Sequence, residues 1–185
     1  MNVVLLALAT ASYAAHCWSA VGHFRYVDGV PYALMALSTV WAAAFAAQAA
    51  ALWPGRALAP TAWLALPFFL AALLLWLWTV RASRRARLSV AFSRDTPTRL
   101  LDAGPYRLIR HPFYTGYALN WFAGCVATWH WWVIAPSVAA AVMLAIAARS
   151  EERKFARSPL AADYAAYRAR TGMFLPRLRR GSRRT

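Results

Sequence analysis

The stretch TAWLALPFFLAALLLWLWTV, residues 61–80, decides the fold class of this chain. It contains no charged residue and has the length of about 20 residues that an α-helix needs to cross the hydrocarbon core of a bilayer. Two comparable windows precede it, at 3–24 and 31–53, and a longer apolar tract follows at 114–148. The sequence therefore predicts an all-α, polytopic integral membrane protein.

The tract at 114–148 is too long for one membrane span, because about 35 residues would extend over about 50 Å at the helical rise of 1.5 Å per residue. A polar, tryptophan-rich patch at 128–132, followed by Pro136, interrupts it. We therefore expect a short fourth helix, a tight turn near His130 and a fifth helix that ends beyond Arg149. This division predicts about five transmembrane helices.

Composition supports a membrane protein over a soluble domain. The 185 residues are 61% hydrophobic and carry a formal net charge of +15, a combination that suits a bilayer, where lipid covers apolar surface and charges gather in short loops. The length allows one domain, with three helices in 1–80, a second region at 98–178 and a basic tail at 179–185 that we expect to be disordered. Only Met1 and Asn2 precede the first apolar run, which lacks the basic start of a signal peptide and is predicted to be a retained helix.

The positive charges sort onto one side of a five-helix topology. The first loop carries Arg25, residues 81–111 carry eight arginines, and the chain from Arg149 onward carries eleven cationic residues. Because these make up 20 of the 21 lysines and arginines, the positive-inside rule places this side in the cytoplasm and the N-terminus outside. The preference for arginine and alanine, with Lys154 the single lysine, indicates a bacterial inner membrane.

We attribute the excess of positive charge to the membrane topology and to attraction between the arginines and anionic membrane lipids. Nucleic-acid binding is disfavoured, because the arginines are not interleaved with exposed aromatic residues on a soluble surface. Cys17 and Cys125 lie in different apolar segments without metal-ligand spacing, so we expect packing roles for them and no metal site. His16 and His23 are also given structural roles, although polar groups within a membrane often serve a function. The sequence leaves the oligomeric state open.

The segment GPYRLIRHPFYTGY, residues 104–117, is the first of three that could carry chemistry. Pro112 disfavours helical geometry at His111 and suits the first position of a helix, so a helix should begin at Pro112 on the cytoplasmic membrane face. The unpaired N–H groups and positive dipole end of such a helix favour an anionic ligand. The side chains gathered around this start are Tyr106, Arg107, Arg110, His111, Tyr114 and Tyr117. The alternative is a plain helix start at the membrane interface.

The second segment is the pair Glu151 and Glu152, two of only six acidic residues in the chain. They lie toward a helix C-terminus, where the dipole disfavours negative charge. One interpretation pairs Glu151 with Lys154 and Arg149 with Glu152 at i,i+3 spacing. The other has one carboxylate facing inward to bind a cationic or hydroxyl-bearing ligand.

The third segment is DYAAYRARTGMFLP, residues 163–176. Tyr164, Tyr167 and Arg170 recur at a spacing of three, roughly on one face of a helix, and Gly172 offers a stop. We expect a cytoplasmic amphipathic helix that turns these three side chains inward and closes a pocket.

Together these residues resemble the isoprenylcysteine carboxyl methyltransferase family, and phospholipid N-methyltransferases are similar over the same region. The shared pattern covers about residues 98–178 and consists of Gly-Pro-Tyr, Arg-His-Pro and Tyr-x-Gly in 104–116, the glutamates at 151–152, Tyr-x-x-Tyr-x-x-Arg at 164–170, and Pro176. The family usually has Phe-Gly before Tyr-x-x-Tyr, whereas Leu160 and Ala161 stand here. That departure leaves open which glutamate faces the pocket.

The resemblance implies a membrane enzyme that binds S-adenosyl-L-methionine from the cytoplasm within 98–178. It further implies methyl transfer to a lipophilic small molecule from the bilayer, such as an isoprenoid carboxylate, a phenol or a lipid headgroup. The residues that it suggests for catalysis are Arg110, Glu152 and Arg170. The residues expected to bind the cofactor are Tyr106, His111, Pro112, Tyr114, Glu151, Tyr164 and Tyr167.

Two other functions stay open at this point. One is an NADPH-dependent membrane reductase of the sterol-reductase type, whose C-terminal region looks similar but whose chains are usually longer. The other is a non-catalytic membrane scaffold. The sequence does not identify the acceptor atom, which could be oxygen, nitrogen or sulfur.

Overall fold

The computed structural model describes residues 1–26, 29–86, 88–89, 92–93 and 96–177. Within this part of the chain the regular structure is helical, with isolated bridges but no named strand. The α-helices are α1 (Asn2–Gly22), α2 (Tyr32–Ala51), α3 (Ala65–Ser83), α4 (Pro112–Thr128), α5 (Trp131–Ala156) and α6 (Ala161–Arg170). Two 3₁₀ turns, η1 (Ala62–Leu64) and η2 (Gly104–Arg107), precede α3 and α4. The basic tail predicted at 179–185 lies outside the described residues.

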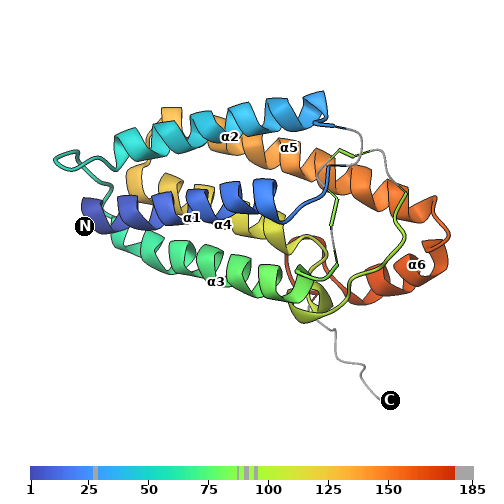
Figure 1. Ribbon diagram of the computed structural model, residues 1–185. Helices are drawn as coiled ribbons and strands as arrows, with labels where there is room; N and C mark the ends of the chain where they lie inside the picture. The colour runs from blue at the N-terminus through green and yellow to red at the C-terminus, as the bar shows by residue number, and fades with distance from the viewer. Residues whose placement is uncertain (27–28, 87, 90–91, 94–95, 178–185) are drawn as a thin grey trace, which may run out of the picture.

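The long helices α1 to α5 run side by side as a bundle, and α6 lies at the end opposite the N-terminus (Figure 1). Four of them, α1, α2, α3 with its preceding turn, and α5, are long and apolar enough to cross a bilayer. This confirms the predicted all-α, polytopic membrane fold. Helix α4 has 17 residues, which fits the prediction of a short fourth helix and falls below the length of the other four.

Helix α4 nevertheless extends along α3 from one end of the bundle to the other. At one end, Ala59 N donates to Ala127 O at 2.9 Å, and Thr61 Oγ1 donates to Val126 O at 2.9 Å. At the other end, η2 packs against α3. The loop before α3 and the α4–α5 turn therefore share one end of the bundle, as the five-helix topology requires.

The break between α4 and α5 lies where the polar patch predicted it, although Pro136 takes no part in it. Trp129 adopts a left-handed conformation with φ of 55°, and His130 directly precedes α5. Pro136 lies inside α5, because a proline early in a helix removes one hydrogen bond that the surrounding bundle can replace. The predicted start of α4 at Pro112 is confirmed.

The bundle buries small residues inside and leaves large apolar ones outside, as expected for a protein solvated by lipid. Ala9, Ala65 and Ala123 are fully buried between α1, α3 and α4, together with a few larger side chains such as Phe69. Leu74 and Val138 are more than half exposed. The apolar exterior and the small-residue interior both fit an integral membrane protein.

A tight contact in the interior joins α2 and α4 at Gly124. The buried Gln48 donates from Nε2 to Asn120 O at 3.0 Å, and its side chain occupies the space that a Cβ at Gly124 would need. We expect Gly124→Ala to lower the free energy of unfolding in detergent by about 1–2 kcal/mol, because Gln48 must rotate away and lose its bond.

The control for this prediction is Gly22→Ala, since a Cβ at Gly22 would meet its nearest neighbour, Trp18, at an ordinary 3.6 Å. That variant should unfold like the wild type. Adding Gln48→Ala to Gly124→Ala should recover stability, because the two side chains compete for one space. If the stability lost in the double variant equalled the sum of the losses in the two single variants, this contact would not exist.

Candidate functional site

The site forms where the start of α4 meets the end of α6. Arg110 N donates to Gly172 O at 2.9 Å, His111 N donates to Met173 O at 3.1 Å, and Gly172 N donates to Leu108 O at 3.1 Å. These backbone bonds hold together two segments that are about 60 residues apart in the sequence. The side chains at the start of α4 therefore face those that end α5 and α6.

Arg110 and Glu152 form a buried ion pair at the centre of this junction. Arg110 Nε donates to Glu152 Oε1 at 2.7 Å, and both side chains are only 8% exposed. The same guanidinium donates from Nη1 to Thr171 O at 2.6 Å. Arg168 Nε, which is largely exposed, approaches Glu152 Oε2 at 3.6 Å. The segment before α4 and helix α6 thus converge on one carboxylate of α5.

His111 lies between the two glutamates. Its Nδ1 is 3.7 Å from Glu151 Oε2, and its Nε2 is 3.5 Å from Glu152 Oε1. The ring stacks on Tyr114 at 5.4 Å with an interplanar angle of 4°, and the Tyr114 hydroxyl donates to Glu151 Oε1. Both carboxylates therefore face the same cluster. Pro112, buried at the first position of α4, fixes the backbone beside His111.

The tyrosines of η2 and α6 pack behind this cluster. Tyr106, Tyr164 and Tyr167 are all buried, and the Tyr167 hydroxyl donates to Tyr106 O at 2.8 Å. Tyr164 stacks on Phe155 of α5 at 4.7 Å. Burial raises the pKa of all three phenols above the usual value, so they stay protonated and serve as donors. The predicted inward placement of Tyr164 and Tyr167 is confirmed.

The predicted inward placement of Arg170 is wrong. Its side chain is 58% exposed and donates to Asp102 Oδ2 at 2.9 Å, with its guanidinium 5.6 Å from the ring of Tyr167. Each helical residue turns by about 100°, so two steps of three carry Arg170 about 120° away from Tyr164. Arg107 also lies exposed, at the end of η2.

Arg168, although largely exposed, is the α6 arginine that approaches Glu152, and sequence reasoning missed it. It follows Tyr164 by four residues, the spacing that keeps two side chains on one helical face, so the signal was present. Thr171 was missed too, because it contributes its backbone carbonyl, a group that every residue type has. With Arg110, Gly172, Met173 and Arg177, these residues line a polar pocket beside the ion pair.

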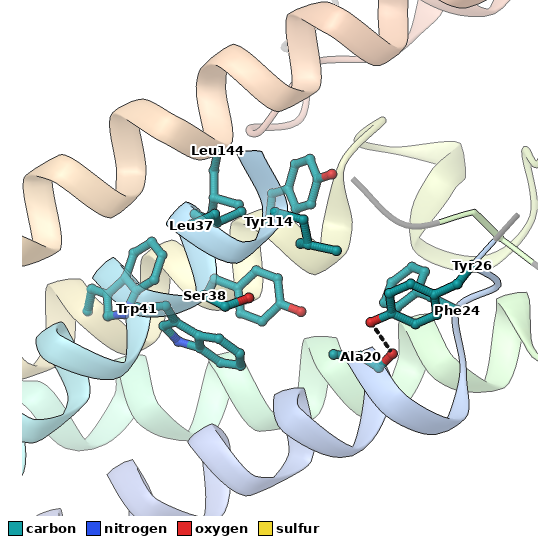
Figure 2. A pocket seen from close by; sticks show the side chains of 11 residues that line it. Ala20, Phe24, Tyr26, Leu37, Ser38, Trp41, Tyr114 and Leu144 are labelled. Carbon is teal, nitrogen blue, oxygen red and sulfur yellow. Dashed lines mark hydrogen bonds between the residues drawn. The ribbon is translucent and has the colours of Figure 1, made fainter. Parts of the chain in front are cut away.

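A second, apolar cavity lies on the membrane side of the cluster, between α1, α2, α4 and α5 (Figure 2). It encloses about 560 Å³ of unfilled space, its open mouth included. Tyr114 belongs to both the polar cluster and the apolar cavity, because its ring lines the cavity and its hydroxyl donates to Glu151. The polar cluster and the apolar cavity therefore share one wall.

Comparison with protein families matches residues 60–160, from η1 to the end of α5, to the phospholipid methyltransferase family. The match spans more than half of the 185 residues. The chain belongs to the phospholipid methyltransferase family. Members of this family are integral membrane methyltransferases related to the isoprenylcysteine carboxyl methyltransferases, so the predicted resemblance is confirmed.

The family match covers the start of α4 and both glutamates and ends before α6. It establishes a membrane methyltransferase in general terms and favours this function over the reductase and the scaffold. No curated protein and no solved structure matches the chain. The assignment of α6 to the site therefore depends on the contacts described above.

Proposed function

We propose that this phospholipid methyltransferase family member transfers a methyl group from S-adenosyl-L-methionine to a lipophilic acceptor. The observation that supports this most is the shared wall at Tyr114. A charged, hydrogen-bonding cluster suited to a polar cofactor lies on one side of it, and an apolar cavity suited to an acceptor from the bilayer lies on the other.

The donor set of the cluster fits S-adenosylmethionine, whose sulfonium supplies an electrophilic methyl group. Arg110, Arg168 and Arg177 in the polar pocket suit the carboxylate of its methionyl part. Glu152 suits the ammonium group or the ribose hydroxyls, and the buried tyrosines offer ring faces and donors. The start of α4 adds the positive end of a helix dipole.

The geometry favours exchanging the roles that the sequence gave the two glutamates. Glu152 is held by Arg110 and approached by Arg168, as a residue that positions a cofactor should be. Glu151 bonds to Tyr114 at the cavity wall, where a proton could be received. Arg110 keeps its predicted place at the centre of the site, and Arg170 lies at its edge.

We place the end of the bundle that carries this cluster in the cytoplasm of a bacterial cell, with the N-terminus outside. Arg25 N bonds to Leu88 O at 2.8 Å, so the first and third loops meet at the end where α6 lies (Figure 1). Together with the chain from Arg149 onward, these loops carry 20 of the 21 lysines and arginines, which supports a cytoplasmic location by the positive-inside rule. Anionic lipid headgroups would bind the arginines at this end of the bundle. Nucleic acid is not a proposed partner.

The proposal is tested by cofactor binding to the purified protein in detergent. We expect S-adenosylmethionine and its demethylated product, S-adenosylhomocysteine, to bind with micromolar affinity, and a hundredfold excess over Kd to raise the free energy of unfolding by about 2.7 kcal/mol. Thermal unfolding and calorimetry measure this. A response to NADPH with none to either methionine derivative would contradict the proposal.

Arg168→Ala should weaken the binding of S-adenosylhomocysteine about tenfold, because the polar pocket loses one of its three guanidinium groups. Arg81→Ala is the matched control, since Arg81 is an exposed arginine at the end of α3, outside both the cluster and the pocket. Equal affinities in the two variants would remove Arg168 from the cofactor site.

A further inference from the structure

Aromatic side chains from α2, α4 and the loop after α1 line most of the apolar cavity. They are Phe24, Tyr26, Trp41, Tyr114, Tyr117 and Trp121. Flat rings in such number favour a ligand with a flat ring of its own, because offset and edge-to-face ring contacts add to the energy of apolar burial.

The cavity is deep enough for a ring followed by a short alkyl segment. Its lining runs from Leu34 to Trp41 on α2 and from Tyr114 to Trp121 on α4. Each pair is seven residues apart, which corresponds to about 10 Å along a helix axis. A longer tail would have to leave between the helices into lipid.

The described residues that line the cavity are all uncharged. The guanidinium of Arg110 lies in the separate polar pocket and is engaged by Glu152 and Thr171. A phosphate or carboxylate buried among apolar rings needs a partner of opposite charge. The cavity lining thus favours an uncharged acceptor over a phospholipid headgroup or a fatty acid.

The polar groups of the lining side chains are the hydroxyls of Tyr26, Ser38, Tyr114 and Tyr117 and the indole N–H groups of Trp41 and Trp121. The hydroxyl of Tyr26 donates to Ala20 O at 2.9 Å, as Figure 2 shows, whereas that of Tyr114 donates to Glu151. A carboxylate acceptor would release no proton on methylation, but a phenol must lose one. The bonded pair of Tyr114 and Glu151 stands at the junction where such a proton could pass.

Resting on the proposed function, we propose that the methyl acceptor is an uncharged amphiphile with a phenol head, bound in this cavity with its hydroxyl at Tyr114. The phenolic oxygen forms a C–O bond to the methyl carbon, and the C–S bond of the sulfonium breaks with its electron pair remaining on sulfur. The phenolic proton passes to the Tyr114 oxygen as the Tyr114 proton passes to Glu151. The products are an aryl methyl ether and a neutral thioether.

The first test measures binding alone, with no cofactor added. The probes are 4-nonylphenol, decanoic acid and phosphatidylethanolamine, added to the full-length protein in detergent and followed by thermal unfolding and calorimetry. We expect 4-nonylphenol to bind at least tenfold more tightly than the other two. Tyr117→Phe should weaken that binding about threefold to tenfold through the loss of one hydroxyl, and Tyr32→Phe, at a 90% exposed tyrosine, should not change it.

The second test follows labelled methyl transfer from S-adenosylmethionine to the same three probes. We expect 4-nonylphenol to become the methyl ether and the other two probes to react at least tenfold more slowly. Retained S-adenosylhomocysteine binding shows that each variant is folded. Equal or faster transfer to decanoic acid or phosphatidylethanolamine overturns the phenol assignment, as does failure to bind or methylate 4-nonylphenol while the cofactor still binds. Loss of cofactor binding in the wild type would overturn the proposed function itself, and this inference with it.

Discussion

Replacing Arg110 by alanine is expected to lower the free energy of unfolding by about 3–5 kcal/mol, the range for breaking a buried ion pair. The side chain of Glu152 is only 8% exposed, so its carboxylate would stay buried beside the weaker contacts of His111 and Arg168. The Thr171 carbonyl would lose its donor as well. Methyl transfer should fall by about 10²–10³-fold, because a positioned cation disappears from the site.

Thermal unfolding in detergent and single-turnover transfer of labelled methyl groups measure the two effects of Arg110→Ala. The matched control is Arg170→Ala, which also breaks an arginine–carboxylate pair. Because Arg170 and Asp102 are 58% and 56% exposed, the cost there should be at most about 1 kcal/mol. If the two variants lost equal stability, burial would not strengthen the Arg110 pair.

A double variant separates the structural part of Arg110 from the functional part. Arg110→Met combined with Glu152→Met removes both charges and keeps the volume, so stability should return to within about 1 kcal/mol of the wild type. Methyl transfer should stay lost. Recovery of transfer in the stable double variant would show that Arg110 only supports the fold.

Glu151→Gln is expected to lower the rate of methyl transfer to a phenol by about 10²–10⁴-fold, the range for loss of a general base. The amide keeps the shape and can still accept a hydrogen bond from Tyr114, yet it cannot hold the proton. Cofactor affinity should change less than threefold, because Glu151 bonds to the wall of the acceptor cavity.

Glu152→Gln is the comparison, since it makes the same chemical change one residue along the helix. It should mainly weaken S-adenosylhomocysteine binding, because Glu152 is the carboxylate that Arg110 and Arg168 surround. Separate measurements of kcat and of the KM for the cofactor distinguish the two effects. If Glu151→Gln raised that KM and left kcat unchanged, the two roles would have to be exchanged.

The limits of the helices could be predicted because each depends on a local property of the chain. The apolar length fixed the spans, and Pro112 fixed the start of α4 through its restricted φ and missing N–H. The polar patch marked the break before α5. These signals act within a few residues, so no knowledge of the packing was needed.

The contacts of the site could be predicted only in part. The glutamate pair and the Arg-His-Pro segment were expected to meet, yet the sequence could not tell that both carboxylates reach His111. For α6, a spacing of three suggested Arg170, whereas the actual helix brings the largely exposed Arg168 close to Glu152. A helical periodicity defines a face about 100° wide, and its neighbours decide which edge of that face is buried.

By itself, the sequence determined that this protein is a helical membrane protein and that its charged residues gather at one end of the bundle. Hydrophobic length and the cost of burying charge act on each segment separately, so their effects can be recognised from the sequence alone. Only the tertiary structure decided that Arg110 pairs with Glu152, 42 residues away, and that an apolar cavity opens beside Tyr114. Both depend on how separate helices pack, and that is set by the fit of all their side chains together.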